Sequence, residues 1–176
     1  YGKLEDMYFD YNYEGEVILS DSYIFPNGEG IKTHNNGQIY KGNFKLSQLD
    51  GYGEIRDPDY ILKGDFIDGY LHGYGEITCT NGARYNGDYV KGELVKGTYL
   101  SSTGNAKYEG EFKNLKKHGE GRYIFSGNTE EGLFKDDYFV EGLYSLKDRF
   151  IIYGKFNIDR NTLKKTTLGE VKLINK

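Results

Sequence analysis

Histidine is the first residue type to test for chemistry, because its imidazole binds metal ions and transfers protons. His72 and His118 each stand directly before a glycine, in LHGYG and KHGEG, and are 46 residues apart. If these segments are strands four positions apart in a sheet, about 19 Å separates them, which no shared metal ion spans. His34 is solitary. We therefore expect all three to be turn or packing histidines and predict no metal site.

Glycine-rich runs are the second candidate, because closely spaced glycines can hold a phosphate group. The runs are GYGEI at Gly51–Ile55, GYGEI at Gly73–Ile77 and GEGRY at Gly119–Tyr123. A dinucleotide-binding fingerprint occurs once and opens a helix. These runs recur and continue into strand-like sequence, so we expect no nucleotide or other cofactor.

Acid–base and nucleophilic chemistry also lack a suitable set of residues. The carboxylate neighbours Glu130–Glu131 and Asp136–Asp137 are adjacent, so on a strand they point to opposite faces. Cys79 is the single cysteine, which excludes an intrachain disulfide, and it lies in no nucleophile motif. The sequence predicts no catalytic residue and a protein that is not an enzyme.

Composition limits the elements that could carry any site. Among 176 residues there are 25 glycines, 18 tyrosines and 10 phenylalanines. Such a glycine content disfavours a helical bundle, and so many aromatic rings disfavour a disordered tail. The formal net charge of −4 argues against binding of nucleic acid. A β-rich protein that combines glycines with aromatic rings remains.

A repeat of 22 or 23 residues organises the chain, with one longer interval that contains Pro26 and that we interpret as a loop insertion. Its core unit is aromatic–x–Gly–x–aromatic, as in YKGNF at Tyr40–Phe44. A Gly–x–Gly–x–apolar run and a turn dipeptide follow it. The central glycines of the seven units are Gly15, Gly42, Gly64, Gly87, Gly110, Gly132 and Gly154.

Each period is predicted to form two short strands joined as a hairpin. In Tyr40–Phe44 the first, third and fifth residues share one face of a strand, and polar residues occupy the other face. Each glycine leaves a notch that a ring on the adjoining strand can cover. The hairpins must stack, because a single hairpin is marginal in water. The predicted turns are Asn36–Gly37, Asp57–Pro58–Asp59, Asn81–Gly82, Gly104–Asn105 and Gly127–Asn128.

These residues resemble the MORN (membrane occupation and recognition nexus) repeat family from residue 13 to residue 156. The best copies are LKGDFIDGYLHGYGEI at Leu62–Ile77 and YEGEFKNLKKHGEGRYIF at Tyr108–Phe125. Leu62, Glu130 and Ile152 depart from the motif's leading tyrosine. The resemblance implies an all-β, elongated, single-layer, twisted antiparallel sheet of about seven stacked hairpins. It also implies a scaffold in a cytoskeletal or membrane-proximal assembly.

An aromatic face is the candidate binding surface, because a single-layer sheet leaves one apolar face without a second layer. We expect it to bind a protein partner, such as a peptide or an amphipathic helix. An open sheet also leaves two edges that allow homodimerisation. The candidate residues are Tyr40, Phe44, Phe66, Tyr85, Tyr89, Tyr108, Phe112 and Phe134.

Residues 1–12 are interpreted as an N-terminal cap or lead-in strand, 13–156 as the repeat array and 157–176 as a basic cap or tail. The tail supports a first alternative, a phospholipid-binding membrane tether in which lysines contact anionic lipid. A second alternative is a regulatory fragment of a larger enzyme. We expect a cytoplasmic location, associated with cytoskeleton or membrane. The lipid-contacting candidates are Lys164, Lys165, Lys172 and Lys176.

Overall fold

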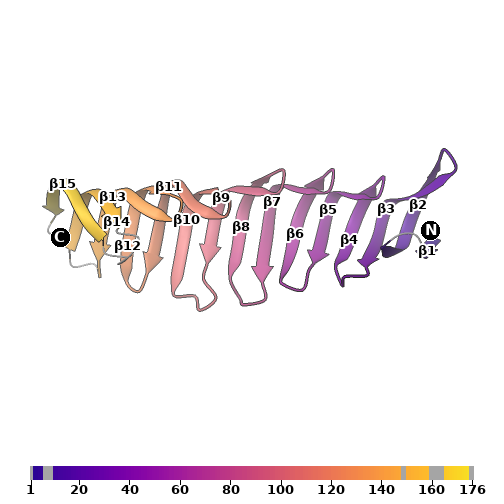
Figure 1. Ribbon diagram of the computed structural model, residues 1–176, viewed down its shortest axis with the longest axis horizontal. Coiled ribbons are helices and arrows are strands. Elements are labelled where there is room, and N and C mark those ends of the chain that lie inside the picture. The colour runs from indigo at the N-terminus through magenta and orange to yellow at the C-terminus, as the bar shows by residue number, and fades with distance from the viewer. Residues whose placement is uncertain (1, 6–9, 148–149, 159–164, 175–176) are drawn as a thin grey trace. The chain divides into compact units, whose positions relative to one another are not determined.

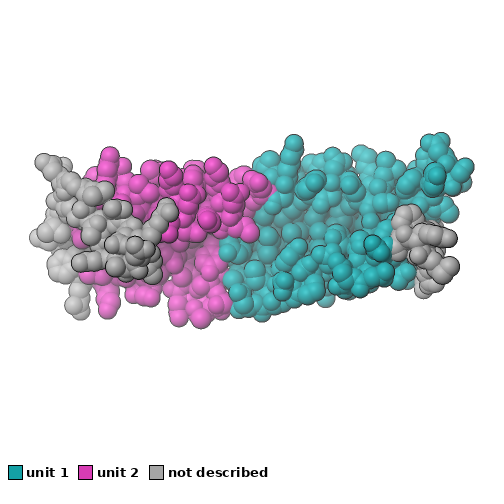
Figure 2. All heavy atoms as spheres, in the orientation of Figure 1, with its two compact units in different colours: residues 1–92 teal, residues 93–176 magenta. Residues whose placement is uncertain are grey.

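The computed structural model describes residues 2–5, 10–147, 150–158 and 165–174, and these form strands and the turns between them. The chain divides into two compact units, residues 1–92 and 93–176 (Figure 2). Among the described residues there is no helix, and each unit is an antiparallel sheet of hairpins. The predicted all-β class is confirmed.

Strand order follows the sequence within each unit, and every pairing is antiparallel (Figure 1). Unit 1 contains the hairpins β2–β3, β4–β5 and β6–β7, and unit 2 contains β10–β11, β12–β13 and β14–β15. The described strands of unit 1 are β1 (Gly2–Glu5), β2 (Tyr11–Ser20), β3 (Tyr23–His34), β4 (Ile39–Lys45), β5 (Gln48–Arg56), β6 (Tyr60–Ile67), β7 (Tyr70–Cys79) and β8 (Arg84–Val90). Those of unit 2 are β9 (Glu93–Leu100), β10 (Ala106–Lys113), β11 (Lys116–Phe125), β12 (Asn128–Lys135), β13 (Tyr138–Leu146), β14 (Phe150–Ile158) and β15 (Lys165–Ile174).

The predicted turns lie between strands, where short polar side chains replace missing backbone pairings. The Asn81 side-chain oxygen accepts a hydrogen bond from the Ala83 N–H at 2.9 Å. In the turn after β5, Asp57 accepts one from the Asp59 N–H at 3.0 Å. Both are Asx turns, which explains why Asn and Asp recur at these positions.

Two-residue turns at the opposite ends of the hairpins have a positive φ at both central residues. In the β4–β5 turn these are Leu46, with φ 47°, and Ser47, with φ 73°. Such values define a type I′ turn, which matches the twist of paired strands and favours Asn–Gly. Tertiary pairing therefore imposes this conformation on residues that do not favour it.

The interval that contains Pro26 is longer strand rather than a loop, which corrects the expected loop insertion. β2 and β3 extend the hairpin, with Val17 opposite Pro26 and Ser20 opposite Tyr23. Pro26 is buried in β3 and accepts, through its carbonyl, a hydrogen bond from the Ser47 N–H at 2.9 Å.

Glycines pair directly with glycines across consecutive strands of each unit. We call this line the glycine crease. In unit 1 it comprises Gly15, Gly30, Gly42, Gly53, Gly64, Gly75 and Gly87, and in unit 2 Gly97, Gly110, Gly121, Gly132, Gly142 and Gly154. A Cβ added to Gly64, whose φ is +150°, would lie 2.6 Å from the Tyr74 carbonyl oxygen. The crease therefore excludes side chains.

The strands bend at the glycine crease. Residues four apart on a straight strand are separated by about 13 Å. The rings of Tyr108 and Phe112, on either side of Gly110, have centroids only 5.1 Å apart, in an edge-to-face arrangement. The Tyr108 hydroxyl also lies 2.9 Å from the Glu111 carbonyl oxygen, three residues along. The bend brings both halves of one strand face together.

Large side chains cover the crease glycines on the face that the bend encloses, which we call the inner face. The Tyr108 ring lies over Gly121, where an added Cβ would be 2.5 Å from its Cε2 atom. Tyr13 covers Gly30 in the same way, whereas Leu71 covers Gly64 and Gly75. Rings do cover the glycines, but Tyr108 also covers Gly110 of its own strand.

Candidate functional site

Six of the eight aromatic residues expected on an exposed face are core residues. Their exposed fractions range from 0 % for Tyr108 to 7 % for Phe112. The Tyr108 and Phe134 rings meet at 5.1 Å, because the bend folds the inner face onto itself. The bend therefore buries these six rings, and they do not form the partly exposed aromatic face that the sequence predicts. The six are Phe44, Phe66, Tyr89, Tyr108, Phe112 and Phe134.

Tyr40 and Tyr85 are the two remaining candidates, and both are half-buried. They end a row of inner-face residues in register across β4 to β8. Each neighbouring pair is directly opposite in the strand register, and every member is half-buried. We call this row the inner row: Tyr40, Ile55, Leu62, Ile77 and Tyr85. Tyr40 and Tyr85 are the members of the predicted aromatic face that solvent still reaches.

Polar groups surround the Tyr40 end of the inner row. The Tyr40 hydroxyl lies 3.4 Å from Oε1 of Gln38, and the Gln38 amide donates to Asp57 at 2.6 Å. Burial, together with the negative charge of Asp57, raises the pKa of Tyr40. His34 lies 5.1 Å from the Tyr40 ring, and burial followed by the charge of Lys32 lowers its pKa. Both side chains are therefore uncharged near neutral pH.

Two lysines, Lys32 buried and Lys117 half-buried, occupy inner-face positions among aromatic rings. The Lys32 ammonium lies 4.4 Å from the Tyr11 ring centroid and donates to the Ser47 carbonyl at 2.6 Å. The Lys117 ammonium lies 4.0 Å from the Tyr123 ring centroid. Burial lowers the pKa of both. These cation–π contacts explain how a charge is accommodated in this core.

The histidines lie on separate elements, His118 in β11 and His72 in β7. His118 lies 3.6 Å from Asp136 through Nδ1, and its carbonyl lies 3.1 Å from the Tyr108 hydroxyl. His72 is half-buried in β7 of the other unit. Among the residues that the structure describes, no group of three or more His, Cys, Asp or Glu side chains is arranged to hold a metal ion.

The carboxylate neighbours and the cysteine are the other residues that the sequence offered for chemistry. Glu130 is buried at 8 % exposure while Glu131 is exposed, as expected for opposite faces of a strand. Asp136 and Asp137 form a turn, with φ of 50° and 75°. Cys79 is half-buried at the end of β7. No arrangement of these groups resembles an acid–base pair or an activated nucleophile.

The lysines of the lipid-contacting alternative lie outside the described side chains. Lys164 and Lys176 are outside the described residues, and Lys165 and Lys172 belong to β15, where the backbone alone is described.

The other side of the sheet, the outer face, carries two exposed tyrosines that the sequence analysis did not single out. Tyr52 is 63 % exposed and Tyr74 is 62 % exposed. Each is the middle residue of a Gly–Tyr–Gly run, and each lies directly opposite an aspartate, Asp65 and Asp88 respectively. The missed signal was the residue between the glycines, which is tyrosine in two consecutive runs.

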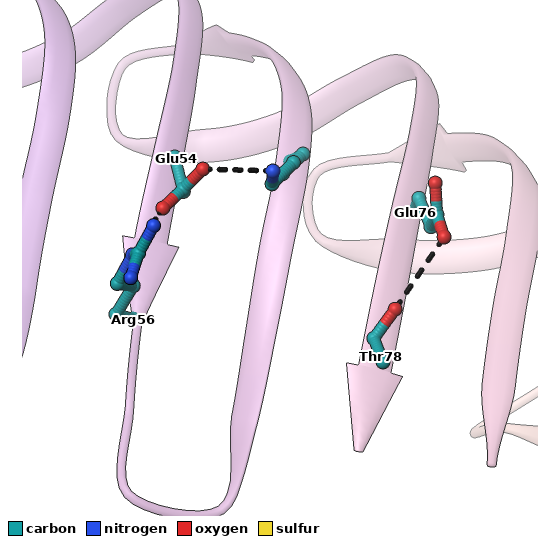
Figure 3. Close-up of polar contacts among 5 residues, drawn as sticks. Glu54, Arg56, Glu76 and Thr78 are labelled. Carbon is teal, nitrogen blue, oxygen red and sulfur yellow. Dashed lines mark hydrogen bonds and ion pairs between the residues drawn. The ribbon is translucent and has the colours of Figure 1, made fainter. Parts of the chain in front are cut away.

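Charged side chains form a second line on the outer face, next to these tyrosines. Glu54 on β5 binds the Arg56 guanidinium and the Lys63 ammonium, the latter at 3.0 Å (Figure 3). These two cations lower the pKa of Glu54. On β7, two strands from β5, the Thr78 hydroxyl lies 3.4 Å from the exposed Glu76 carboxylate. A shallow hollow of about 170 Å³ lies here, lined by Ile61, Lys63, Glu76 and Thr78.

Three segments of the chain match the family model described as the MORN repeat: residues 40–60, 63–84 and 108–130. They include four of the seven crease glycines of unit 1 and two of those of unit 2. Comparison with curated proteins found no match. No helix long and apolar enough to cross a membrane occurs in the part of the chain that the structure describes.

Proposed function

The chain belongs to the MORN repeat family, and from that premise we propose that it is a non-catalytic scaffold or adaptor. It binds a segment of a protein partner along the inner row, within a cytoskeletal or membrane-proximal assembly. The observation that carries the proposal is the inner row itself, which is apolar, half-buried and in register across five consecutive strands.

The dimensions of the inner row favour an amphipathic helix as the bound segment. At about 4.8 Å per strand, Tyr40 and Tyr85 are roughly 19 Å apart along the row. A helix rises 1.5 Å per residue, so about 13 residues would cover this length. Apolar side chains on one helix face would then meet Ile55, Leu62 and Ile77, and the tyrosines at both ends would add contact area and hydroxyl groups.

Affinity capture with the full chain, followed by cross-linking mass spectrometry, tests this proposal. We expect a partner whose apolar segment cross-links to β4–β8. Its capture should fall at least about tenfold with the Tyr40→Ala/Tyr85→Ala variant. Tyr23→Ala, which alters a 69 % exposed tyrosine outside the inner row, serves as the control. Capture unaffected by the double variant, or no captured partner, would refute the proposal.

The membrane-tether alternative depends on the four C-terminal lysines, and liposome sedimentation tests it separately. Vesicles that contain phosphatidylserine should bind the wild-type chain and release the variant with all four lysines changed to glutamine. Equal, negligible binding of both proteins would dismiss it.

A further inference from the structure

We propose that the outer face of unit 1 is a second binding surface, which takes an arginine-rich segment of a protein partner. It consists of two tyrosine–aspartate pairs, Tyr52 with Asp65 and Tyr74 with Asp88. This inference goes beyond the proposed function, because it concerns the opposite face of the sheet and does not depend on the inner row.

The two tyrosines are not needed for the fold. The residue directly before the crease glycine is Glu29 in β3 and Glu120 in β11, and it is Lys96 in β9 and Glu141 in β13. Four other strands of the same repeat therefore carry a charged side chain here. Exposure of 63 % and 62 % shows that neither ring packs in the core. A contact made outside the folded chain explains tyrosine at these positions.

The rings are accessible because glycines flank them along the strand. Gly51 and Gly53 border Tyr52, and Gly73 and Gly75 border Tyr74, so no side chain of an adjacent residue covers either ring. The bend at the crease also spreads the outer face, since it closes the inner one. A planar group can therefore stack on each ring.

The negative charge of this surface favours a cationic partner segment. Asp65 and Asp88 are exposed, and neither forms an ion pair or side-chain hydrogen bond with another described residue. The nearby cations Arg56 and Lys63 are both bound to Glu54 (Figure 3). An incoming cation meets unneutralised carboxylates, while an anionic lipid surface would be repelled. Guanidinium fits best, because it stacks on aromatic faces and pairs bidentately with carboxylates.

The spacing sets the pattern of arginines. Tyr52 and Tyr74 lie on strands two positions apart, about 10 Å at roughly 4.8 Å per strand. A polyproline II chain has three residues per turn and rises about 3.1 Å per residue, so side chains three residues apart lie on one face, about 9 Å apart. The surface therefore suits arginines three residues apart, with the exposed Glu76 beside the second tyrosine as a further carboxylate.

Fluorescence anisotropy with a labelled nine-residue peptide, arginine at positions 1, 4 and 7 and glycine elsewhere, tests the inference at about 150 mM salt. We expect saturable binding to the full chain. Binding should weaken at least about tenfold for Tyr52→Ala/Tyr74→Ala and for Asp65→Asn/Asp88→Asn. Peptides with lysine or glutamate at the same positions should bind more weakly or not at all.

Matched controls separate this surface from general attraction to an acidic protein. Tyr23→Ala removes another exposed tyrosine, and Asp21→Asn/Asp59→Asn removes two exposed carboxylates elsewhere. Each should change the affinity less than twofold. If the alanine pair lowers the unfolding midpoint, Tyr52→Gln/Tyr74→Gln replaces it, since polar residues occupy this position in other strands. No binding, equal loss with the controls, or equal binding of the lysine peptide would overturn the inference.

Discussion

At the scale of single residues, Tyr108 combines two roles, as Tyr13 does in unit 1. Its ring covers the crease glycines Gly110 and Gly121, a task that Leu71 performs for Gly64 and Gly75. Its hydroxyl lies 2.9 and 3.1 Å from the carbonyl oxygens of Glu111 and His118, where the strands depart from regular pairing. Lys117 replaces the leucine in that repeat, so the tyrosine compensates for the missing apolar cover.

Tyr108→Phe should lower the free energy of unfolding by about 1 kcal/mol near neutral pH, because a buried hydrogen bond is lost. Burial raises the pKa of Tyr108 to about 12. The native state therefore holds this proton more tightly than the unfolded state. The resulting stability is complete below pH 10 and is lost as the pH rises toward 12, at roughly 1.4 kcal/mol per pH unit.

The difference between wild type and Tyr108→Phe should accordingly narrow by about 1 kcal/mol between pH 9 and pH 11. Urea unfolding curves of both proteins across this range provide the measurement. The other buried tyrosines contribute equally to the pH dependence of unfolding in both proteins, so their contribution cancels in the difference. A difference that stays constant with pH would contradict the assigned role of the Tyr108 hydroxyl.

At the scale of elements, each hairpin has two different ends. The Asn–Gly and Asp–Pro–Asp turns use residues that favour their backbone conformation. The β4–β5 turn holds Leu46 and Ser47 at positive φ. An L-residue in this region costs roughly 1–2 kcal/mol. The pairing of Lys45 with Gln48 and of Phe44 with Leu49 offsets that cost.

Leu46→Asn/Ser47→Gly should therefore stabilise the protein by about 1–2 kcal/mol, because the new residues favour a type I′ turn. Leu46 is 57 % exposed, so little packing is lost. Thermal and urea unfolding would measure the gain. Asp68→Asn, in a turn that already has Gly69, is the control and should change stability by less than about 0.5 kcal/mol. No gain from the double variant would mean that the wild-type turn is unstrained.

At the scale of the molecule, contacts run mainly between strands adjacent in sequence within each unit. Stability in such arrays is approximately a sum of repeat terms and nearest-neighbour terms. The loss of stability that a substitution causes should then be confined mainly to its own strand and the strands next to it. A substitution in one of the two units, residues 1–92 or 93–176, should therefore destabilise mainly that unit.

Gly64→Ala tests this locality. Its Cβ would lie 2.6 Å from the Tyr74 carbonyl oxygen and 2.8 Å from a Leu71 methyl group, so we expect a loss of about 2–4 kcal/mol. Hydrogen exchange by mass spectrometry should show faster exchange in β5–β8 and little change in β12–β13. Gly37→Ala has φ +89° but nothing within 4 Å, and should cost less. Uniform acceleration across the chain would contradict locality.

The sequence was sufficient to predict the hairpins, because period and alternation specify strands, and Asn36–Gly37 or Asn81–Gly82 specify turns. It did not reveal the bend, since alternation says which residues share a face but not whether that face is flat. The error on Phe44 and Phe66 followed from this. Tyr52 was overlooked because the Gly–x–Gly runs were considered for their glycines and not for the residue between them. The exposure that distinguishes it depends on the bend.

The glycine crease also has a consequence for copy number. A duplication or loss of one 22- or 23-residue period adds or removes two strands and leaves every remaining glycine opposite another glycine. An insertion of any other length within a strand would move a side chain into the crease. Recombination between repeats could therefore lengthen or shorten such a chain in whole hairpins, whereas small insertions would be confined to the turns.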